Sequence, residues 1–310
     1  MKILISDTLE HEGIKIFEEN GFDVVKNFNI TKEELAKEIE KYDAIVVRSR
    51  TKLTADILEK AKNLKVIGRA GVGLDNIDLK KAKELNIKVL NTPEAPSISV
   101  AELALGMMFN LARYISVADE TTHCNEWNKN DYLGFTLYEK KLGLIGFGNI
   151  GKELAKRAIA LGMKVGVFSR FSKGKSAIDE AKSFGCIIYP TIEDALKDAQ
   201  IISLHLPASE KTEKIINEST LKLMSPKSIL VNTARGKLVD EGALVKALKN
   251  KQIAGAALDV FCEEPLKNQD LINCKDNLIL TPHIGSQTEE TQSSAAIGIA
   301  QKISDFLKNK

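Results

Sequence analysis

The chain has 310 residues, of which 44% are hydrophobic and 28% charged, and a chain of this size and ordinary globular composition favours two domains. Its 44 Lys and Arg residues nearly balance its 42 Asp and Glu residues, so no overall positive field would attract nucleic acid or an anionic membrane. The four cysteines form no CxxC pair, which favours reduced thiols over a zinc or redox site. The N-terminal apolar run is too short for a signal peptide and no later segment is long enough to span a bilayer, so we expect a soluble cytoplasmic protein.

The first part of the chain alternates short runs rich in Ile and Val with amphipathic stretches, which predicts strands separated by helices. A capping box at Thr31 and Glu34, and the N-cap candidates Thr54 and Asp78, predict where three of the helices begin. This alternation predicts a mostly parallel sheet with helices on both faces. Strands are expected at Lys2–Ser6, Asp23–Lys26, Ala44–Arg48, Lys65–Gly68 and Lys88–Leu90.

The alternation breaks near residues 91–96 (NTPEAP), and we place a domain boundary there. Val100 to about His123 is expected to form one helix that leads into a second α/β unit with a larger doubly wound sheet. A final helix from about Gln287 can cross back onto the first unit. Further strands are expected at Leu142–Gly146, Lys164–Phe168, Cys186–Tyr189, Gln200–Leu204, Ser228–Asn232, Ala254–Leu258 and Asn277–Leu280.

A GxGxxG pattern (GFGNIG) at residues 146–151 follows a predicted strand and opens an amphipathic helix, which is the context of a dinucleotide-binding turn. The first glycine permits the tight turn, the second lets a pyrophosphate approach the backbone, and the third lets the helix pack closely on the strand. The helix N-terminus then faces the anion. The alternative is a glycine-rich turn that binds nothing.

The strand after this helix usually ends with an Asp or Glu that accepts hydrogen bonds from the ribose 2′-hydroxyl of NAD. Here the strand is followed by Ser169 and Arg170, with Lys173 and Lys175 nearby. A hydroxyl and a guanidinium suit a 2′-phosphate better, which tilts the expectation towards NADP(H). If Arg170 is instead a solvated charge stacking on adenine, NAD is equally acceptable. The sequence therefore predicts NAD(H) or NADP(H).

Three further motifs each follow a predicted strand: LVNTARG at residues 230–236, ALDVFCEEP at 257–265 and TPHIG at 281–285. Ligands bind outside the carboxyl ends of the strands of an open α/β sheet, so the three segments can converge beside the dinucleotide. Together with GxGxxG, they resemble the D-isomer-specific 2-hydroxyacid dehydrogenase family over nearly the whole chain. The resemblance implies a Rossmann dinucleotide-binding domain, residues 99–283, inserted in a flavodoxin-like substrate domain, residues 1–98 and 284–310.

The resemblance makes His283 the general acid and base, Glu264 its carboxylate partner and Arg235 the clamp on the substrate carboxylate. Each of these residues alone could be an ordinary loop residue, but their joint occurrence favours catalysis. Oxidising a 2-hydroxy acid removes the hydroxyl proton as hydride leaves C2, and a histidine titrates in the right range. The expected cofactor contacts are Gly146, Gly148, Asn149, Ile150, Gly151, Ser169, Arg170, His205, Leu206, Pro207, Thr212, Thr233, Ala234, Arg235, Asp259, His283 and Gly285.

Within the family the first domain supplies substrate contacts, and here its segments resemble those of the D-3-phosphoglycerate dehydrogenases. Arg48 and Arg69 would give a phosphorylated substrate two positive partners, unless they form ion pairs at a domain interface. The backbone N–H groups of residues 70–73 could bind the substrate carboxylate. The expected substrate contacts are Arg48, Ser49, Arg69, Ala70, Gly71, Val72, Gly73, Arg235 and His283.

The resemblance thus implies an NAD(P)-dependent dehydrogenase that interconverts 3-phosphoglycerate and 3-phosphohydroxypyruvate, the first step of serine biosynthesis. Glyoxylate and hydroxypyruvate reductases share the catalytic residues and stay an alternative. A dinucleotide-sensing corepressor, which keeps the same three residues, is an alternative of another class. The resemblance is to the short form without a C-terminal regulatory domain, and it implies a homodimer in which the segment around Trp127 and Lys129 reaches the partner subunit. No metal is expected.

Overall fold

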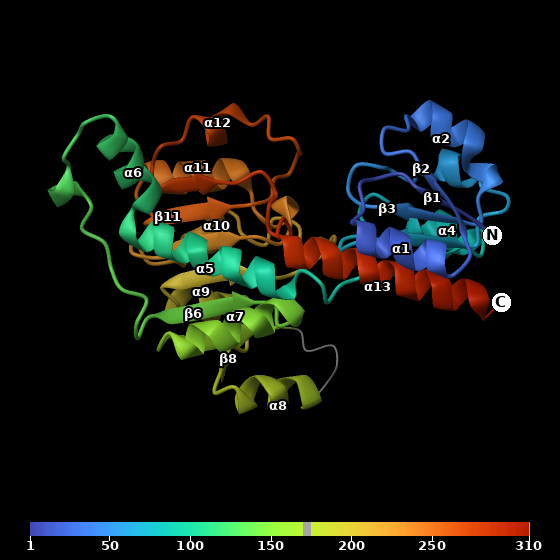
Figure 1. Cartoon of the computed structure of the whole chain (residues 1–310). Helices are drawn as coiled ribbons and strands as arrows, with labels where there is room; N and C mark the ends of the chain where they lie inside the picture. The colour runs from blue at the N-terminus through green and yellow to red at the C-terminus, as the bar shows by residue number, and fades with distance from the viewer. Residues whose placement is uncertain (170–174, 310) are drawn as a thin grey trace. The chain divides into compact units, whose positions relative to one another are not determined.

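The computed structural model describes residues 1–169 and 175–309. The chain divides into two compact units: unit 1 comprises Met1–Ser97 and Ser286–Lys310, and unit 2 comprises Ile98–Gly285. Within each unit, helices cover both faces of a parallel sheet (Figure 1). The structure thus confirms the expected fold class of two doubly wound α/β domains.

Unit 1 contains a five-stranded sheet in the order β2-β1-β3-β4-β5, the order of a flavodoxin-like fold. Every adjacent pair of strands is parallel, and β3 is buried along its whole length. The strands are β1 (Lys2–Ile5), β2 (Asp23–Lys26), β3 (Ala44–Val47), β4 (Val66–Arg69) and β5 (Lys88–Asn91). The helices are α1 (His11–Glu19), α2 (Lys32–Glu38), the 3-10 helix η1 (Ile39–Lys41), α3 (Ala55–Leu58), α4 (Leu79–Glu84) and α13 (Glu289–Lys308).

The two faces of this sheet are covered by different parts of the chain. Helices α1 and α13 lie side by side on one face, where Phe17 and Ile303 are fully buried (Figure 1). Helices α2, α3 and α4 supply the other core, with Leu35 and Ile57 at its centre. A side chain on Gly13 would come within 2.6 Å of the Ala296 carbonyl oxygen, so a glycine is needed where α1 packs on α13. The final helix therefore completes the core of unit 1.

Unit 2 contains a seven-stranded parallel sheet in the order β12-β11-β10-β9-β6-β7-β8. The order reverses between β6 and β9, which creates the topological switch point at which such sheets bind ligands. The strands are β6 (Lys141–Ile145), β7 (Lys164–Phe168), β8 (Ile187–Ile188), β9 (Ile201–Leu204), β10 (Ile229–Asn232), β11 (Gly255–Leu258) and β12 (Leu278–Leu280). The α-helices are α5 (Ser97–Arg113), α6 (Ile115–His123), α7 (Asn149–Ala160), α8 (Lys175–Ser183), α9 (Ile192–Asp198), α10 (Glu218–Leu221), α11 (Glu241–Lys249) and α12 (Gln269–Ile272). Two 3-10 helices, η2 (Lys129–Asp131) and η3 (Gly236–Leu238), complete the unit.

The prediction of a single helix from Val100 to His123 is wrong. Helix α5 ends at Arg113 and α6 starts at Ile115, because Tyr114 between them has a left-handed backbone with φ 54°. The Asn110 side chain accepts a hydrogen bond from the Ser116 N–H, 2.9 Å away, and stabilises this break. Among the described residues, no single helix could cross a membrane by length and apolarity; α5 and α6 reach that standard only as a pair bent by 63°.

All three residues predicted as helix N-caps occupy the N-cap position. The Thr31 hydroxyl and Glu34 form the complete capping box of α2, and the Asp78 carboxylate caps α4. Thr54 occupies the N-cap position of α3, but its hydroxyl donates to the Asp56 carboxylate rather than capping a backbone N–H. All four cysteines are free thiols, as the sequence predicts.

Candidate active site

The turn after β6 has the geometry of a phosphate-binding loop. Gly146 has φ 110°, and a side chain there would lie 2.5 Å from the His205 carbonyl oxygen. A side chain on Gly151 would lie 2.7 Å from the Gly146 carbonyl oxygen. At Gly148, the N-cap of α7, nothing lies within 4 Å of the space that a side chain would fill. Two glycines therefore serve the packing of the turn, while the third leaves open space in front of a twelve-residue helix, which fits a pyrophosphate.

His205 lies across the switch point from this turn, immediately after β9. Its N–H donates to the Ile145 carbonyl oxygen at 2.8 Å, and its Nε2 lies 2.9 Å from the Ser203 hydroxyl. Burial lowers the pKa of His205 to about 4, so the ring is neutral at physiological pH. Beyond it, the Thr212 hydroxyl donates to the Pro207 carbonyl oxygen at 2.8 Å and orders the loop after β9. The segment after β9 thus lies opposite the glycine-rich turn at the switch point.

The residues expected to choose between NAD and NADP follow β7. Ser169 directly follows this strand, whereas Arg170 and Lys173 lie outside the described residues. Lys175 begins α8, but its side chain is also outside the described part of the chain.

A histidine and a carboxylate form a pair at the carboxyl ends of two adjacent strands. His283 follows β12 and Glu264 follows β11, and Nδ1 of the histidine lies 2.8 Å from Oε2 of the glutamate. The second carboxylate oxygen accepts a hydrogen bond from the Phe261 N–H at 3.1 Å. The bond to Glu264 raises the pKa of His283, although burial opposes the rise. Burial alone would raise the pKa of Glu264, but the hydrogen bonds from His283 and from the Phe261 N–H lower it. Both shifts favour an imidazolium paired with a carboxylate.

Asp259 fixes the segment that carries the histidine. Its carboxylate is fully buried and accepts hydrogen bonds from the Thr281 hydroxyl at 2.6 Å, the Ile284 N–H at 2.8 Å and the Gly285 N–H at 2.9 Å. The chain is therefore held on both sides of His283, whose own backbone is left-handed with φ 54°.

Arg235 lies at the end of β10, beside this pair. Its positive charge adds slightly to the lowering of the Glu264 pKa and slightly opposes the rise of the His283 pKa. The Asn232 side chain fixes the turn, because it donates to the Arg235 carbonyl oxygen at 2.9 Å and accepts from the Ala234 N–H at 3.1 Å. The structure thus brings the three residues predicted to be catalytic together at one edge of the sheet of unit 2.

Close backbone packing joins the Arg235 turn to the loop that carries Glu264. A side chain on Gly236 would lie 1.9 Å from the Phe261 backbone carbon, so only a glycine allows the two segments to approach. In the same turn, the hydroxyl oxygen of Thr233 is buried and has no hydrogen-bond partner among the described residues. A buried polar atom without a partner at the end of a strand beside the switch point fits a site that a ligand completes.

The residues of unit 1 that were expected to bind substrate form a network around β3 and β4. The Arg48 N–H donates to the buried Asp7 carboxylate at 2.6 Å. The Ala70 N–H donates to the Val47 carbonyl oxygen, and the Gly71 N–H donates to the Thr92 hydroxyl at 2.8 Å. Two of the four backbone N–H groups expected to grip a carboxylate are therefore engaged within the unit. An N–H that already donates to protein is not available to a ligand, and binding of a carboxylate by this segment stays a prediction.

Two doubly wound sheets, with a glycine-rich turn at a switch point and a His–Glu pair beside it, define a dinucleotide-binding α/β protein. Residues 105–285 match the family model described as D-isomer specific 2-hydroxyacid dehydrogenase, NAD binding domain. The chain belongs to the D-isomer specific 2-hydroxyacid dehydrogenase family. This confirms the resemblance seen in the sequence.

Relatives of known name agree with this membership. The D-3-phosphoglycerate dehydrogenase of Methanocaldococcus jannaschii is 45% identical over 310 residues, which are 100% of this chain and 58% of the relative. The hydroxypyruvate reductase of Thermotoga maritima is 43% identical over 305 residues, 97% of each chain. The structure of D-lactate dehydrogenase from Aquifex aeolicus, complexed with NAD and lactic acid, matches with a TM-score of 0.85 at 29% identity, over 100% of this chain and 96% of that one. The chain thus spans little more than half of the first relative and nearly all of the second.

Proposed function

We propose that this chain catalyses the reversible NAD(P)-dependent oxidation of a D-2-hydroxy acid to a 2-keto acid, with 3-phosphoglycerate and 3-phosphohydroxypyruvate as the substrate pair. The observation that carries the proposal is the 2.8 Å contact between His283 and Glu264 beside Arg235. The bound nicotinamide supplies or accepts the hydride. The open space at Gly148 and the N-terminus of α7 would hold its pyrophosphate.

The protein's part in the reaction is to bind the acid and to move one proton. Because Nδ1 of His283 is engaged by Glu264, Nε2 is the ring nitrogen that exchanges a proton with the substrate oxygen on C2. In reduction the imidazolium donates this proton to the C2 oxygen as hydride reaches C2, and in oxidation the neutral ring accepts it. Arg235 would bind the substrate carboxylate through two hydrogen bonds and polarise the C2 carbonyl.

The choice of substrate rests on the relatives and on unit 1. The 45% identity to the M. jannaschii phosphoglycerate dehydrogenase covers the whole chain, and Arg48 and Arg69 are the residues proposed to bind a phosphate. The second candidate substrate is hydroxypyruvate, because the T. maritima hydroxypyruvate reductase matches this chain over 97% of both lengths. The third hypothesis is that the protein is a dinucleotide sensor, which binds the dinucleotide but turns over no substrate.

One assay distinguishes these three hypotheses about function. Reduced-nicotinamide absorbance is followed with 3-phosphohydroxypyruvate, hydroxypyruvate and glyoxylate, each with NADH and with NADPH. We expect the highest kcat/KM with 3-phosphohydroxypyruvate, and Arg69→Ala should raise KM more for this substrate than for hydroxypyruvate. Fastest turnover of an unphosphorylated keto acid would establish the reductase instead. Dinucleotide binding without turnover of any of the three keto acids would support the hypothesis of a dinucleotide sensor.

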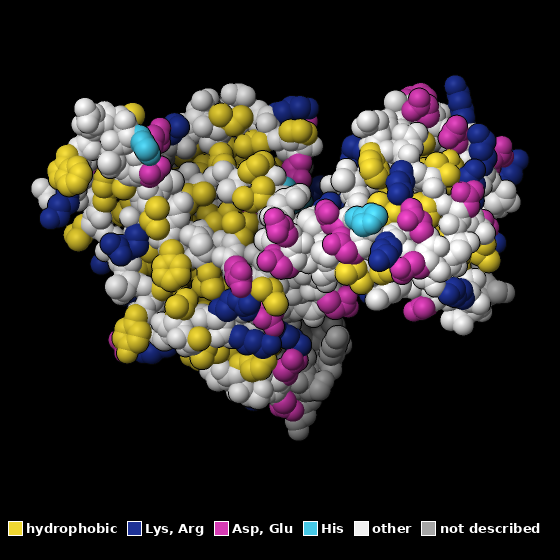
Figure 2. All heavy atoms as spheres, viewed as in Figure 1, with side chains coloured by type: hydrophobic (Ala, Val, Ile, Leu, Met, Phe, Trp, Pro, Cys, Tyr) yellow, Lys and Arg dark blue, Asp and Glu magenta, His cyan; other side chains and the backbone are white. Residues whose placement is uncertain are grey.

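We also propose that the chain forms a homodimer through the apolar face of unit 2. Figure 2 shows hydrophobic side chains gathered where Figure 1 draws α5 and α6. Exposed apolar residues of this region are Phe109, Ile115, Val117, Trp127 and Leu133, the last two with 84% and 90% of their surface accessible. A contiguous exposed apolar patch is typical of a protein interface.

Light scattering after size exclusion tests the proposed dimer. We expect twice the chain mass for the parent protein and a concentration-dependent loss of dimer for Trp127→Lys combined with Leu133→Lys. A parent protein that stays monomeric at high concentration would contradict the proposal. A cytoplasmic location stays a prediction of the sequence.

A further inference from the structure

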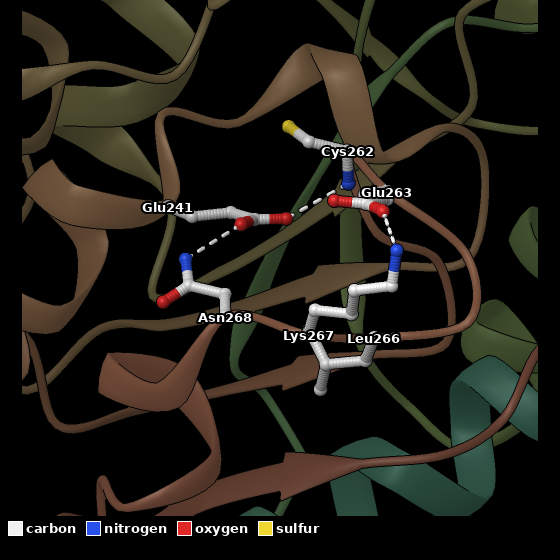
Figure 3. A pocket seen from close by; sticks show the side chains of 6 residues that line it. All are labelled: Glu241, Cys262, Glu263, Leu266, Lys267 and Asn268. Atoms are coloured by element: carbon white, nitrogen blue, oxygen red, sulfur yellow. Dashed lines mark hydrogen bonds and ion pairs between the residues drawn. The ribbon is translucent and has the colours of Figure 1, made fainter.

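Glu241, the first residue of α11, bonds to both ends of the loop that carries Glu264. One carboxylate oxygen accepts a hydrogen bond from the Cys262 N–H at 2.8 Å, and the other accepts one from the Asn268 side-chain amide, also at 2.8 Å. Figure 3 shows this carboxylate between the two donors, at the wall of a pocket of about 320 Å3. A single side chain thus connects the start and the end of loop 262–268.

Apart from these bonds, the loop is held by the close packing of its start on Gly236 and by the contact between Glu264 and His283. Leu266 packs partly buried against the core of unit 2, while the side chains at residues 262–265 and 267 are exposed. The ion pair between Glu263 and Lys267 is solvent-exposed on both sides, and exposed pairs contribute little to stability. The bonds to Glu241 are charge-assisted, which makes them stronger than neutral hydrogen bonds. The Glu241 carboxylate therefore supplies two charge-assisted bonds, one at each end of the loop.

We propose that Glu241 is a positioning residue for proton transfer, which holds Glu264 against His283 by fixing both ends of loop 262–268. The proposal deepens the proposed function, on which it rests for its kinetic readout. Glu241 does not touch His283 or a substrate in this mechanism. It acts through the position of Glu264, whose Oε2 must stay within hydrogen-bond distance of Nδ1.

A simpler reading is that Glu241 only stabilises α11, because an acidic residue in the first turn interacts favourably with the helix dipole. The two readings differ in what happens to His283. The charged groups that face its ring are Glu264, Asp259 and Arg235, and Glu264 is the one that raises its pKa through a hydrogen bond. If the loop loses its anchor, the pKa of His283 falls; if only the helix loses stability, it does not.

The test compares Glu241→Ala with Glu263→Ala. The control removes a carboxylate next to Glu264, but among the described residues this carboxylate pairs only with the exposed Lys267. The His283 ring is titrated by NMR, which is practical because the chain has four histidines, and His283→Ala assigns the signal. The pH profile of keto-acid reduction is measured on the same proteins.

For Glu241→Ala we expect the midpoint of His283 titration to move to lower pH and kcat to fall about 10- to 100-fold, as for a catalytic group displaced by about 1 Å. Glu263→Ala should leave both unchanged. In a Glu264→Gln background, Glu241→Ala should cause no further shift, because the two residues act through one contact. Asn268→Asp, which keeps an N-cap for α12 but faces Glu241 with a second carboxylate, should shift His283 in the same direction and replaces Glu241→Ala if that variant does not fold.

Three results would overturn the proposal: an unchanged His283 midpoint in Glu241→Ala, an equal shift in Glu263→Ala, or a shift that persists in the Glu264→Gln background. The NMR titration requires no turnover. A protein that turns over none of the keto acids would therefore refute the proposed function, while its His283 titration would still decide whether Glu241 positions the pair.

Discussion

His283 is constrained through both its ring and its backbone. The ring is bonded to Glu264, and the two N–H groups that follow it in the chain donate to Asp259. Its φ of 54° lies in a region that non-glycine residues rarely occupy, so these contacts hold a conformation that the residue would not adopt alone. The direction of Nε2 is thereby fixed before substrate binds, which is the arrangement that general acid catalysis requires.

Removing the imidazole should abolish proton transfer without unfolding the protein. His283→Ala is expected to lower kcat by about 10²- to 10⁴-fold, the usual contribution of a general acid or base. The side chain is about half exposed, so the melting temperature should change little. Steady-state kinetics and thermal melting check both points, with the exposed His123→Ala as control. Near-normal turnover of His283→Ala would remove this residue from the mechanism.

The direction of the pKa shift predicts opposite pH dependences for the two directions of reaction. The hydrogen bond to Glu264 raises the pKa of His283 above its ordinary value, although burial and Arg235 oppose this. Reduction needs the protonated ring, so kcat/KM for the keto acid should fall as pH rises through the raised pKa. Oxidation needs the neutral ring and should rise over the same interval.

Glu264→Gln tests the cause of this shift. Without the carboxylate, the falling limb of the reduction profile should move to lower pH, and the oxidation limb should move with it. A limb that stays in place, or that moves to higher pH, would show that Glu264 does not set the pKa of His283.

At the scale of elements, the turn between β6 and α7 contains glycines with two different roles, one in backbone packing and one in leaving space for a ligand. Gly146→Ala should destabilise unit 2 by about 1 to 2 kcal/mol or more, because φ is positive and the added carbon would overlap the His205 carbonyl oxygen. Gly148→Ala should leave the melting temperature unchanged, since φ is −82° and the space is empty, but should weaken dinucleotide binding by occupying that space. Thermal melting and dinucleotide titration of both variants check the contrast. Unweakened binding by Gly148→Ala would place the pyrophosphate elsewhere.

The elements that the sequence predicts well are those with strong local signals. The strands are buried on both faces in the middle of each sheet, so they read as continuous apolar runs, and their bounds agree within one or two residues. The break at Tyr114 could not be predicted, because no glycine or proline marks it; it depends on the Asn110 side chain capping Ser116 from six residues away. The hydrogen bond from the Gly71 N–H to the Thr92 hydroxyl could not be predicted either, because the two residues are distant in sequence.

The candidate active site likewise contains residues that the sequence identifies and residues that only the structure reveals. The motifs around Arg235, Glu264 and His283 identify each residue, and adjacent parallel strands explain why they meet. Glu241 has no such signal. An acidic residue at the start of a helix is common, and only the contacts with Cys262 and Asn268 reveal its connection to the Glu264 loop.

At the scale of the whole molecule, unit 1 is built from the two ends of the chain. Residues 1–97 supply the sheet, and α13 returns after unit 2 to cover one of its faces. Ile299, Ile303 and Leu307 of α13 are buried to 99% or more. A side chain on Gly68 of β4 would lie 2.3 Å from the Cδ1 atom of Ile303, which shows how closely the helix packs on the sheet. The stability of unit 1 therefore depends on α13, residues Glu289–Lys308.

Weakening this helix should destabilise unit 1 selectively. Ile303→Ala removes a fully buried side chain at the sheet surface and should cost about 2 to 5 kcal/mol. Hydrogen exchange measured by mass spectrometry reports the two units separately: we expect faster exchange in β1, β3 and β4 and unchanged exchange in β6 and β9. Gln301→Ala, on the exposed side of the same helix, should leave both unchanged. Equal acceleration in the two sheets would show instead that the units unfold as one, because loss of packing at α13 would then be transmitted through the chain to the sheet of unit 2.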